Sequence, residues 1–285
     1  MFPVAIAVAT VAMSTGIGGA IFFSPIFLLI LRLDPTVAIG TALITELFGF
    51  TSGLIGYLRQ RLIDFTVGFR VLMFSVPAAL VGVVLAEFVP GEVLRAIFAT
   101  GIMFIGWQMF SSWLGERRER LAQAVEEAQA SEAASGGTRE RRVIVDRSGR
   151  RFEYAIFDRG GAMMYGGLGG MLVGMLSVGL AELMEFQMIS KCRIPPPVAV
   201  ATSIFMVMVT VAAASVGHIF SFVSAGPETV RQVVAIAMFT APGVVIGGQL
   251  GPLVQRVAPP EVMKVAISVV FVAVGLFMIA SFAFA

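Results

Sequence analysis

Eight long apolar segments constrain this chain more than any other feature of its sequence. Each is long enough to cross about 30 Å of hydrocarbon at about 1.5 Å per helical residue. Only 13% of the residues are charged, against about a quarter in soluble proteins. The sequence therefore predicts an all-α, multi-pass integral membrane protein. The segments cover roughly residues 3–31, 37–58, 67–89, 93–114, 161–190, 196–223, 230–254 and 262–284.

A polar insert separates the fourth apolar segment from the fifth. Ten of the 20 Lys and Arg residues lie between Arg117 and Arg159. Residues 116–135 have the composition of a charged helix, and residues 141–157 that of two short strands around Arg147-Ser148-Gly149. Two interpretations of the insert stay open, a solvated linker and a small regulatory module.

The two membrane parts of the chain resemble each other. Under a shift of 161 positions, RLDPTVAIGTALI (32–44) aligns without gaps on RIPPPVAVATSIF (193–205), and Gly18 aligns with Gly179. Chance apolar similarity does not account for Arg, Pro, Thr and Gly matching in order. The sequence thus predicts two four-segment repeats, a common build of secondary transporters. The predicted parts are a first repeat (1–114), the insert (115–160) and a second repeat (161–285).

The distribution of Lys and Arg predicts the topology. If all eight segments crossed, 14 of these residues would lie on the insert side of the membrane and six on the other. If the first and fifth segments entered and returned as hairpins, the numbers would be 17 and three. Because cytoplasmic loops carry the excess of positive charge, the second arrangement is favoured. It leaves three crossings per repeat, so the repeats would be inverted, and both arrangements place the insert in the cytoplasm.

The first segment is interrupted by STGIGGAIFFSP (14–25), where a membrane helix should be regular. Irregular backbone at membrane depth needs protein neighbours or a ligand to satisfy it. Free amides at a helix N-terminus carry partial positive charge and suit an anion, and nearby hydroxyl groups add donors. The alternative is that small residues form ordinary helix-packing surfaces. The predicted substrate-binding residues are Thr15, Gly16, Gly18, Gly19, Thr41, Ser177, Gly179, Thr202 and Ser203. Thr41 and Thr202 recur at equivalent places near the start of the next helix, so two facing repeats would bring them to a shared site near the midplane.

Four ionisable residues lie within apolar segments, Glu46, Glu182, Glu185 and His218. Such residues are costly in a membrane and by default suggest function. Glu182 and Glu185 share one helix face, and two buried carboxylates so close would repel, which suits reversible protonation. We assign all four to proton coupling. The alternatives are that Glu182 and Glu185 lie in water near the interface and that His218 and the aligned Tyr57, each near a segment end, are interfacial anchors.

Several classes of function are disfavoured. One cysteine (Cys192) excludes an internal disulfide, and one histidine disfavours an ordinary zinc site, so neither a metal nor a cofactor is expected. No nucleophile–base pair is evident, so we do not expect an enzyme. The basic residues lie in loops beside membrane segments, which indicates topology control rather than nucleic-acid binding. The expected partners are a small anion, protons and membrane lipid, and a homo-oligomer is left open.

The motifs GIGGAIFFSPIFLLI, VAIGTALI, GYLRQRLID and, in the second half, CRIPPPVAVATSIF followed by SVGH resemble the TauE/SafE sulfite exporter family of bacterial membrane proteins. The resemblance implies a carrier of small sulfur-containing anions such as sulfite or sulfonates, often on the export side, in the inner membrane. It makes Gly16, Gly18, Gly19, Thr41, Thr202 and Ser203 substrate-proximal. The chain departs from the pattern in GLAELMEF (179–186), which has acidic residues where the first half has GGAIFFSP.

Three functions follow as competing hypotheses. The first is a proton-coupled carrier that exports a sulfur-containing anion. The second is a carrier or channel for a cation or metal ion, with Glu46, Glu182 and Glu185 as ligands. The third is a non-transporting membrane protein whose insert binds a cytoplasmic partner.

Overall fold

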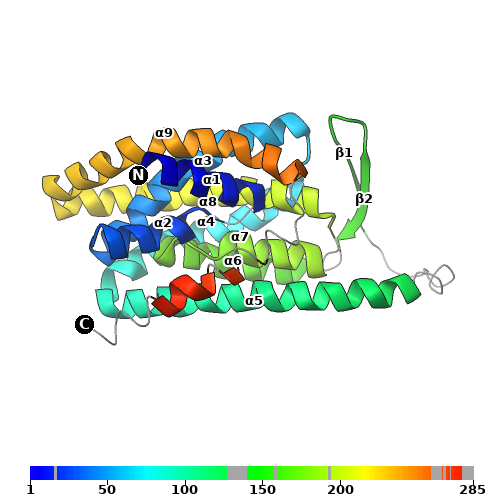
Figure 1. Cartoon of the computed structure of the whole chain (residues 1–285), viewed down its shortest axis with the longest axis horizontal. Coiled ribbons are helices and arrows are strands. Elements are labelled where there is room, and N and C mark those ends of the chain that lie inside the picture. The colour runs from blue at the N-terminus through cyan, green and yellow to red at the C-terminus, as the bar shows by residue number, and fades with distance from the viewer. Residues whose placement is uncertain are drawn as a thin grey trace.

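The chain folds into a bundle of helices with one two-stranded sheet across one end (Figure 1). The computed structural model describes residues 1–15, 18–126, 140–156, 159–191, 194–257, 265, 268–269 and 271–277. We call the end that carries the two strands the insert side. In chain order the elements are α1 (Phe2–Thr15), α2 (Ala20–Pro25), the π-helical turn η1 (Ile26–Ile30), α3 (Pro35–Gln60), α4 (Phe65–Phe88), α5 (Gly91–Glu126), β1 (Glu140–Val145), β2 (Arg151–Ile156), α6 (Arg159–Leu176), α7 (Leu180–Phe186), the π-helical turn η3 (Gln187–Lys191), α8 (Pro196–Ala225) and α9 (Pro227–Val257).

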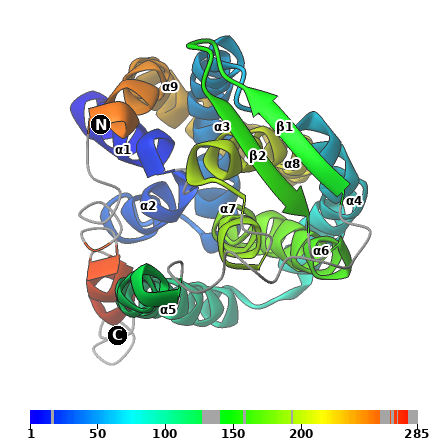
Figure 2. The same ribbon diagram turned by 90° about the vertical axis from the view of Figure 1, so that its right-hand side faces the viewer.

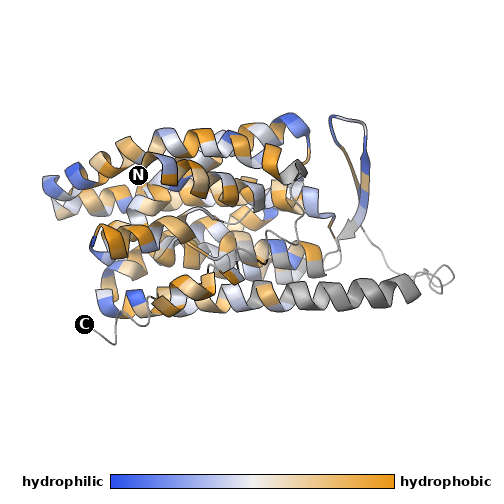
Figure 3. Ribbon diagram, viewed as in Figure 1, coloured by the Kyte–Doolittle hydropathy of each residue, from blue (hydrophilic) through white to orange (hydrophobic). Residues whose placement is uncertain are grey.

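The length and hydropathy of the helices confirm the predicted all-α membrane protein. Among the described residues, α3, α4, α8 and α9 are long and apolar enough to cross a membrane. The helices that begin at Phe2, Ala20 and Gly160 are apolar but shorter. Hydrophobic residues cover the length of the bundle, and hydrophilic ones gather at its ends and on the strands (Figure 3). Such a surface suits a slab of hydrocarbon around the middle of the bundle.

The first apolar segment is a helical hairpin rather than one crossing helix. α1 runs toward the insert side, and α2 with η1 returns beside it (Figure 1). Gly19, at the start of the returning arm, lies against Ala12 near the end of the first arm. Both ends of this segment therefore lie on the side opposite the insert.

The fifth segment forms a second hairpin, entered from the insert side. Leu180 at the start of α7 lies against Gly169 of α6, and Gly179 lies against Leu172, so α7 returns alongside α6. The reversal uses two residues with left-handed backbone, Ser177 (φ 62°) and Gly179 (φ 115°). The structure thus has the two hairpins that the charge distribution favours.

The first arm of each hairpin packs against a helix from the other half of the chain. α1 lies along α9, where a side chain at Gly247 or Gly251 would overlap α1. α6 lies along α4, where a Cβ on Gly174 would overlap the carbonyl of Ala79. Small residues at these positions let the backbones approach closely, as in other membrane helix pairs.

Local capping signals explain where the membrane helices of the first half begin. Asp34 is the N-cap of α3 and accepts a hydrogen bond from the backbone N–H of Thr36 at 3.1 Å, with Pro35 in the first turn. α3 ends at Arg61, whose φ of 58° is left-handed. Asp64 then caps α4, accepting from the backbone N–H of Thr66 at 3.0 Å and of Val67 at 3.1 Å.

The insert begins inside a helix. α5 continues as one helix of 36 residues from Gly91 to Glu126, across the predicted boundary at residue 114. The two predicted strands are present as an antiparallel hairpin in which Glu140 pairs with Ile156 and Val145 with Arg151. The rest of the predicted charged helix, from residue 127 onward, lies outside the described residues. The division into three parts stays a prediction.

Candidate functional site

The break in the first hairpin faces a buried carboxylate. Glu46 lies near the middle of α3 with 3% of its surface exposed. A Cβ on Gly18 would lie 3.0 Å from Oε1 of Glu46, and one on Gly19 would lie 3.7 Å from it. Because both residues are glycines, the carboxyl group reaches the backbone of the break. The structure therefore brings three of the predicted site residues together.

The two hairpin breaks meet through a pair of serines. Ser177, in the second break, has its Oγ 2.6 Å from the carbonyl oxygen of Leu176 and 2.8 Å from Oγ of Ser24 in α2. A hydroxyl has one proton, so when Ser177 donates to the Leu176 carbonyl, Ser24 donates to Ser177. Both side chains are buried. Ser24 was not among the predicted site residues, although it lies within the interrupted stretch STGIGGAIFFSP (14–25).

The returning arm of the second hairpin carries a carboxylate bonded within the bundle. Oγ of Ser203 lies 3.1 Å from Oε1 of Glu185 and 2.9 Å from the carbonyl oxygen of Val200. Glu185 is half-buried. Glu185 and Ser203 are thus brought together. The side chains of Glu182 and Thr15, and the whole of Gly16, lie outside the described residues.

Thr41 and Thr202 do not meet at a shared midplane site. Each lies near the start of its helix, and α3 and α8 run antiparallel, with Gly40 packed against His218 and Phe222 near the end of α8. Thr202 therefore lies toward the insert side, where its Oγ1 accepts a hydrogen bond from the backbone N–H of Asp64 at 3.0 Å. Thr41 lies toward the other side.

Thr41 has a buried hydroxyl that the described residues leave without a hydrogen bond. The side chain is fully buried, and its Oγ1 has no hydrogen-bond partner among the described residues. Leaving a buried polar group unpaired costs about 1–3 kcal/mol. Such a group is a site where a ligand or a water can gain a hydrogen bond.

Tyr57 and His218 each form a hydrogen bond to a backbone carbonyl in the first arm of one hairpin. The Tyr57 hydroxyl donates to the carbonyl of Met13 at 2.8 Å, and Nε2 of His218 donates to the carbonyl of Gly174 at 3.0 Å. Both partners also correspond under the shift of 161 positions. The interpretation of the two side chains as interfacial anchors is wrong, because both are fully buried, each against the first arm of a hairpin.

A groove of about 720 Å³ opens on the side opposite the insert. Its walls come from the end of α4, the end of α8 and the start of α3, and they include the carboxylate of Glu87 and the hydroxyls of Thr36, Ser221 and Ser224. The sequence carried no signal for this groove, because Glu87 reads as an ordinary charge at a helix end.

Comparison with known proteins decides the family. The model of the sulfite exporter TauE/SafE family matches residues 1–278, nearly the whole chain. The chain belongs to the TauE/SafE family. It is a multi-pass membrane transporter, as the TauE/SafE description and its apolar helices indicate, and transporters of this kind are not enzymes.

Two relatives from Bacillus subtilis (strain 168) match over most of their length. "Probable membrane transporter protein YunE" is 23% identical over 273 residues, which cover 93% of this chain and 91% of the relative. "Probable membrane transporter protein YjnA" is 25% identical over 266 residues, which cover 90% of this chain and 91% of the relative. No solved structure gives a significant match.

Proposed function

We propose that this TauE/SafE protein is a secondary transporter that exports a small sulfur-containing anion, such as sulfite or a sulfonate, across the bacterial inner membrane in a proton-coupled manner. The family description and the names of both relatives support transport. The observation that carries the proposal is the meeting of two broken hairpins, with Ser24 bonded to Ser177 and Glu46 against Gly18.

The meeting point suits an anion that must be both bound and released. Backbone amides at the starts of α2 and α7 can donate hydrogen bonds there, and Ser24 can do so by giving up its bond to Ser177 in exchange for the anion. The unsatisfied hydroxyl of Thr41 is a further donor toward the side opposite the insert. Neutral donors of this kind bind an anion less tightly than a buried arginine, because charge-assisted hydrogen bonds are about twice as strong. Weak binding favours turnover.

Glu46 supplies a reason for proton coupling. An anion about 5 Å from an ionised carboxylate would be repelled by roughly 3 kcal/mol at an effective dielectric constant of about 20. Protonation of Glu46 removes that repulsion and turns the carboxyl group into a hydrogen-bond donor. Binding of the anion and of a proton would then favour each other.

The same proposal includes two inverted repeats with the insert in the cytoplasm. The paired contacts of Tyr57 with Met13 and of His218 with Gly174 support the repeat. The excess of Lys and Arg on the insert side supports a cytoplasmic insert. In a Cys192→Ser background, Asp34→Cys should react with a membrane-impermeant maleimide from outside the cell and Arg61→Cys only after permeabilisation. The reverse pattern would overturn the assigned orientation.

The decisive experiment is transport by the full chain in liposomes. Labelled sulfite and a labelled sulfonate should move faster when a pH gradient is imposed. Glu46→Gln should remove the dependence on the gradient, whereas Glu92→Gln, at an exposed carboxylate, should keep it. Movement of a divalent metal ion in place of any anion would favour the cation carrier, and no movement of either would contradict the proposal.

A further inference from the structure

The β-hairpin of the insert lies flat across the insert side of the bundle. Its strands pass in front of α8 between α3 and α6 (Figure 2). Alternate residues face the helices, since Tyr154 belongs to the buried core and Ile144 and Phe152 pack against it. Val143 and Val145, on the opposite face, are 48% and 47% exposed. The hairpin is therefore docked on the membrane part by one face rather than suspended in solvent.

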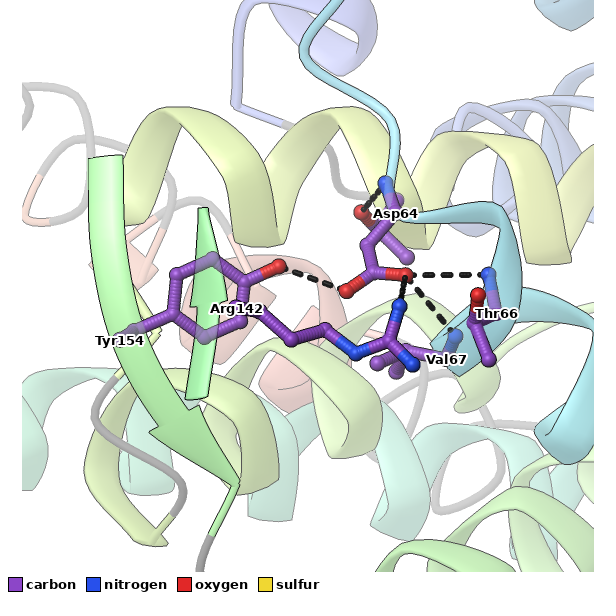
Figure 4. A network of polar contacts seen from close by, with 6 residues as sticks. Asp64, Thr66, Val67, Arg142 and Tyr154 are labelled. Carbon is purple, nitrogen blue, oxygen red and sulfur yellow. Dashed lines mark hydrogen bonds and ion pairs between the residues drawn. The ribbon is translucent and has the colours of Figure 1, made fainter. Parts of the chain in front are cut away.

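Two side chains on the docked face contact one carboxylate, that of Asp64, which lies in the turn between α3 and α4. The hydroxyl of Tyr154 donates to Oδ2 of Asp64 at 2.7 Å, and Nη1 of Arg142 lies 3.4 Å from Oδ1 (Figure 4). The same Oδ1 accepts the two backbone amides that begin α4. Only 4% of the Asp64 surface is exposed. A single buried side chain thus joins both strands to the start of a membrane helix.

Two further bonds extend this junction to α3 and α8. The backbone N–H of Arg147, in the hairpin turn, donates to the carbonyl of Gln60 at the end of α3, at 3.1 Å. The backbone N–H of Asp64 donates to Oγ1 of Thr202 in α8. The ends of three membrane helices are therefore joined at one corner, and two of them are bonded directly to the hairpin.

We propose that the hairpin is a latch that holds the insert side of the transporter closed and must release for that side to open. The latch consists of the contacts of Arg142, Arg147 and Tyr154 with Gln60 and Asp64. It regulates access to the transport pathway, and in this it rests on the proposed transport function. The corresponding connection in the second half, between α8 and α9, is the single residue Gly226, and the described residues place no insert there.

The hairpin has internal hydrogen bonds that would preserve its conformation when it undocks from the bundle. A two-stranded hairpin is marginally stable alone, so its shape must be held by local bonds if it is to close again. Asp146 supplies them, with Oδ1 accepting from the backbone N–H of Ser148 at 2.8 Å and of Arg150 at 2.9 Å. Oδ2 of Asp146 pairs with Nε of Arg150 at 2.7 Å. The turn thus keeps its form whether or not the hairpin is docked.

Accessibility of the corner tests the latch without any transport assay. In full-length protein with Cys192→Ser, a cysteine placed at Ile63, which is buried beside Asp64, should react slowly with a polar maleimide. Tyr154→Phe removes one hydrogen bond to a charged partner, and the labelling rate should rise about tenfold. Tyr165→Phe is the matched control, since it removes a tyrosine hydroxyl from α6 rather than from the hairpin, and it should not change the rate. Equal rates in all three proteins would overturn the latch.

A disulfide across the latch gives a second, independent test. Gln60→Cys with Arg147→Cys joins two residues already linked by a backbone hydrogen bond, a separation that suits a disulfide. When oxidised, this protein should lose at least nine-tenths of its anion transport and regain it on reduction. Val143→Cys with Glu153→Cys joins the strands to each other, not to the bundle, and should transport equally in both states.

The outcomes separate the latch from the transport function. Full transport by the oxidised Gln60–Arg147 protein would show that the hairpin stays docked throughout the cycle and would refute the latch alone. Absence of transport in the unmodified protein would refute the proposed function. The labelling of Ile63→Cys would still decide whether Tyr154 holds the corner closed.

Discussion

Thr41 and Thr202 occupy corresponding positions in the two halves, yet their surroundings differ. The hydroxyl of Thr202 is bonded to the backbone of Asp64, in a corner covered by the β-hairpin. The hydroxyl of Thr41 is buried without a hydrogen-bond partner among the described residues. The groove walled by Thr36 and Glu87 opens on the side to which Thr41 belongs.

This difference distinguishes the insert side, where hydrogen bonds join the helix ends to the hairpin, from the opposite side, where the Thr41 hydroxyl lacks such a bond among the described residues. On the insert side, the hydroxyls of Thr202 and Tyr154 are both bonded to Asp64. On the opposite side, the buried hydroxyl of Thr41 has no hydrogen-bond partner among the described residues, and a groove opens in the surface. The two halves have the same arrangement of helices but different polar contacts at the helix ends. The insert provides the additional contacts on its own side, through Tyr154, Arg142 and Arg147.

The largest effect is expected from the two aspartate caps. Asp64→Ala should lower the free energy of unfolding by about 3 kcal/mol, because it removes a helix cap and leaves the buried hydroxyl of Tyr154 without its partner. Asp34→Ala removes the exposed cap of α3 and should cost about 1 kcal/mol or less. Thermal unfolding in detergent measures both. Equal losses would remove the asymmetry between the two ends.

Replacing the two threonines by valine should give effects of opposite kind. Thr202→Val leaves the buried N–H of Asp64 unsatisfied and should destabilise the protein by about 1–3 kcal/mol. Thr41→Val removes an unsatisfied hydroxyl and should leave the melting temperature equal or higher. It should nevertheless raise the KM for the transported anion. A clear loss of stability in Thr41→Val would show that its hydroxyl is satisfied after all.

Tyr57 and His218 test whether the hairpins are held equally. Tyr57→Phe leaves the carbonyl of Met13 without its donor, and His218→Phe does the same to Gly174. Each should cost about 1–2 kcal/mol in the free energy of unfolding. Thermal unfolding of both single variants and of the double variant measures these losses. A much larger loss in one of them would mean that only one hairpin depends on this bond.

The smallest effect is expected from pH. The Ser148 hydroxyl, with bonds from Arg150 and the backbone, lowers the pKa of Asp146 to about 2. Its stabilising contribution is therefore complete above the unfolded pKa of about 4 and is lost as pH falls toward 2. Burial and the nearby charge of Asp64 raise the pKa of Tyr154, so its contribution is complete below about pH 10. Labelling of Ile63→Cys, corrected for thiol ionisation, should stay constant from pH 5 to 8.

Local patterns predicted much of the fold. The glycines and serines of the first segment indicated a break, the excess of Arg on one side favoured hairpins, and Arg147-Ser148-Gly149 marked the turn between the strands. Each of these signals lies within one short stretch of chain. The shift of 161 positions also paired Tyr57 with His218 before their contacts were known.

Contacts between distant stretches could not be predicted in the same way. Asp64 and Tyr154 are 90 residues apart, and the sequence around neither residue predicts a contact with the other. Tyr57 and His218 were expected at the interface because each lies near a segment end, but neighbouring helices cover both. Thr41 and Thr202 were expected to meet, whereas antiparallel α3 and α8 place them toward opposite sides.

The packing of each hairpin's first arm against a helix from the other half of the chain has a consequence for biosynthesis. α1 is made first, but α9, against which it packs, begins about 210 residues later in the chain. At about 5–20 residues per second, α1 waits roughly 10–40 s for its partner. During that time the small-residue face of α1 must be shielded by lipid or by the insertion machinery. The nascent first half is therefore an incomplete structure, and the order of insertion becomes part of how the transporter is made.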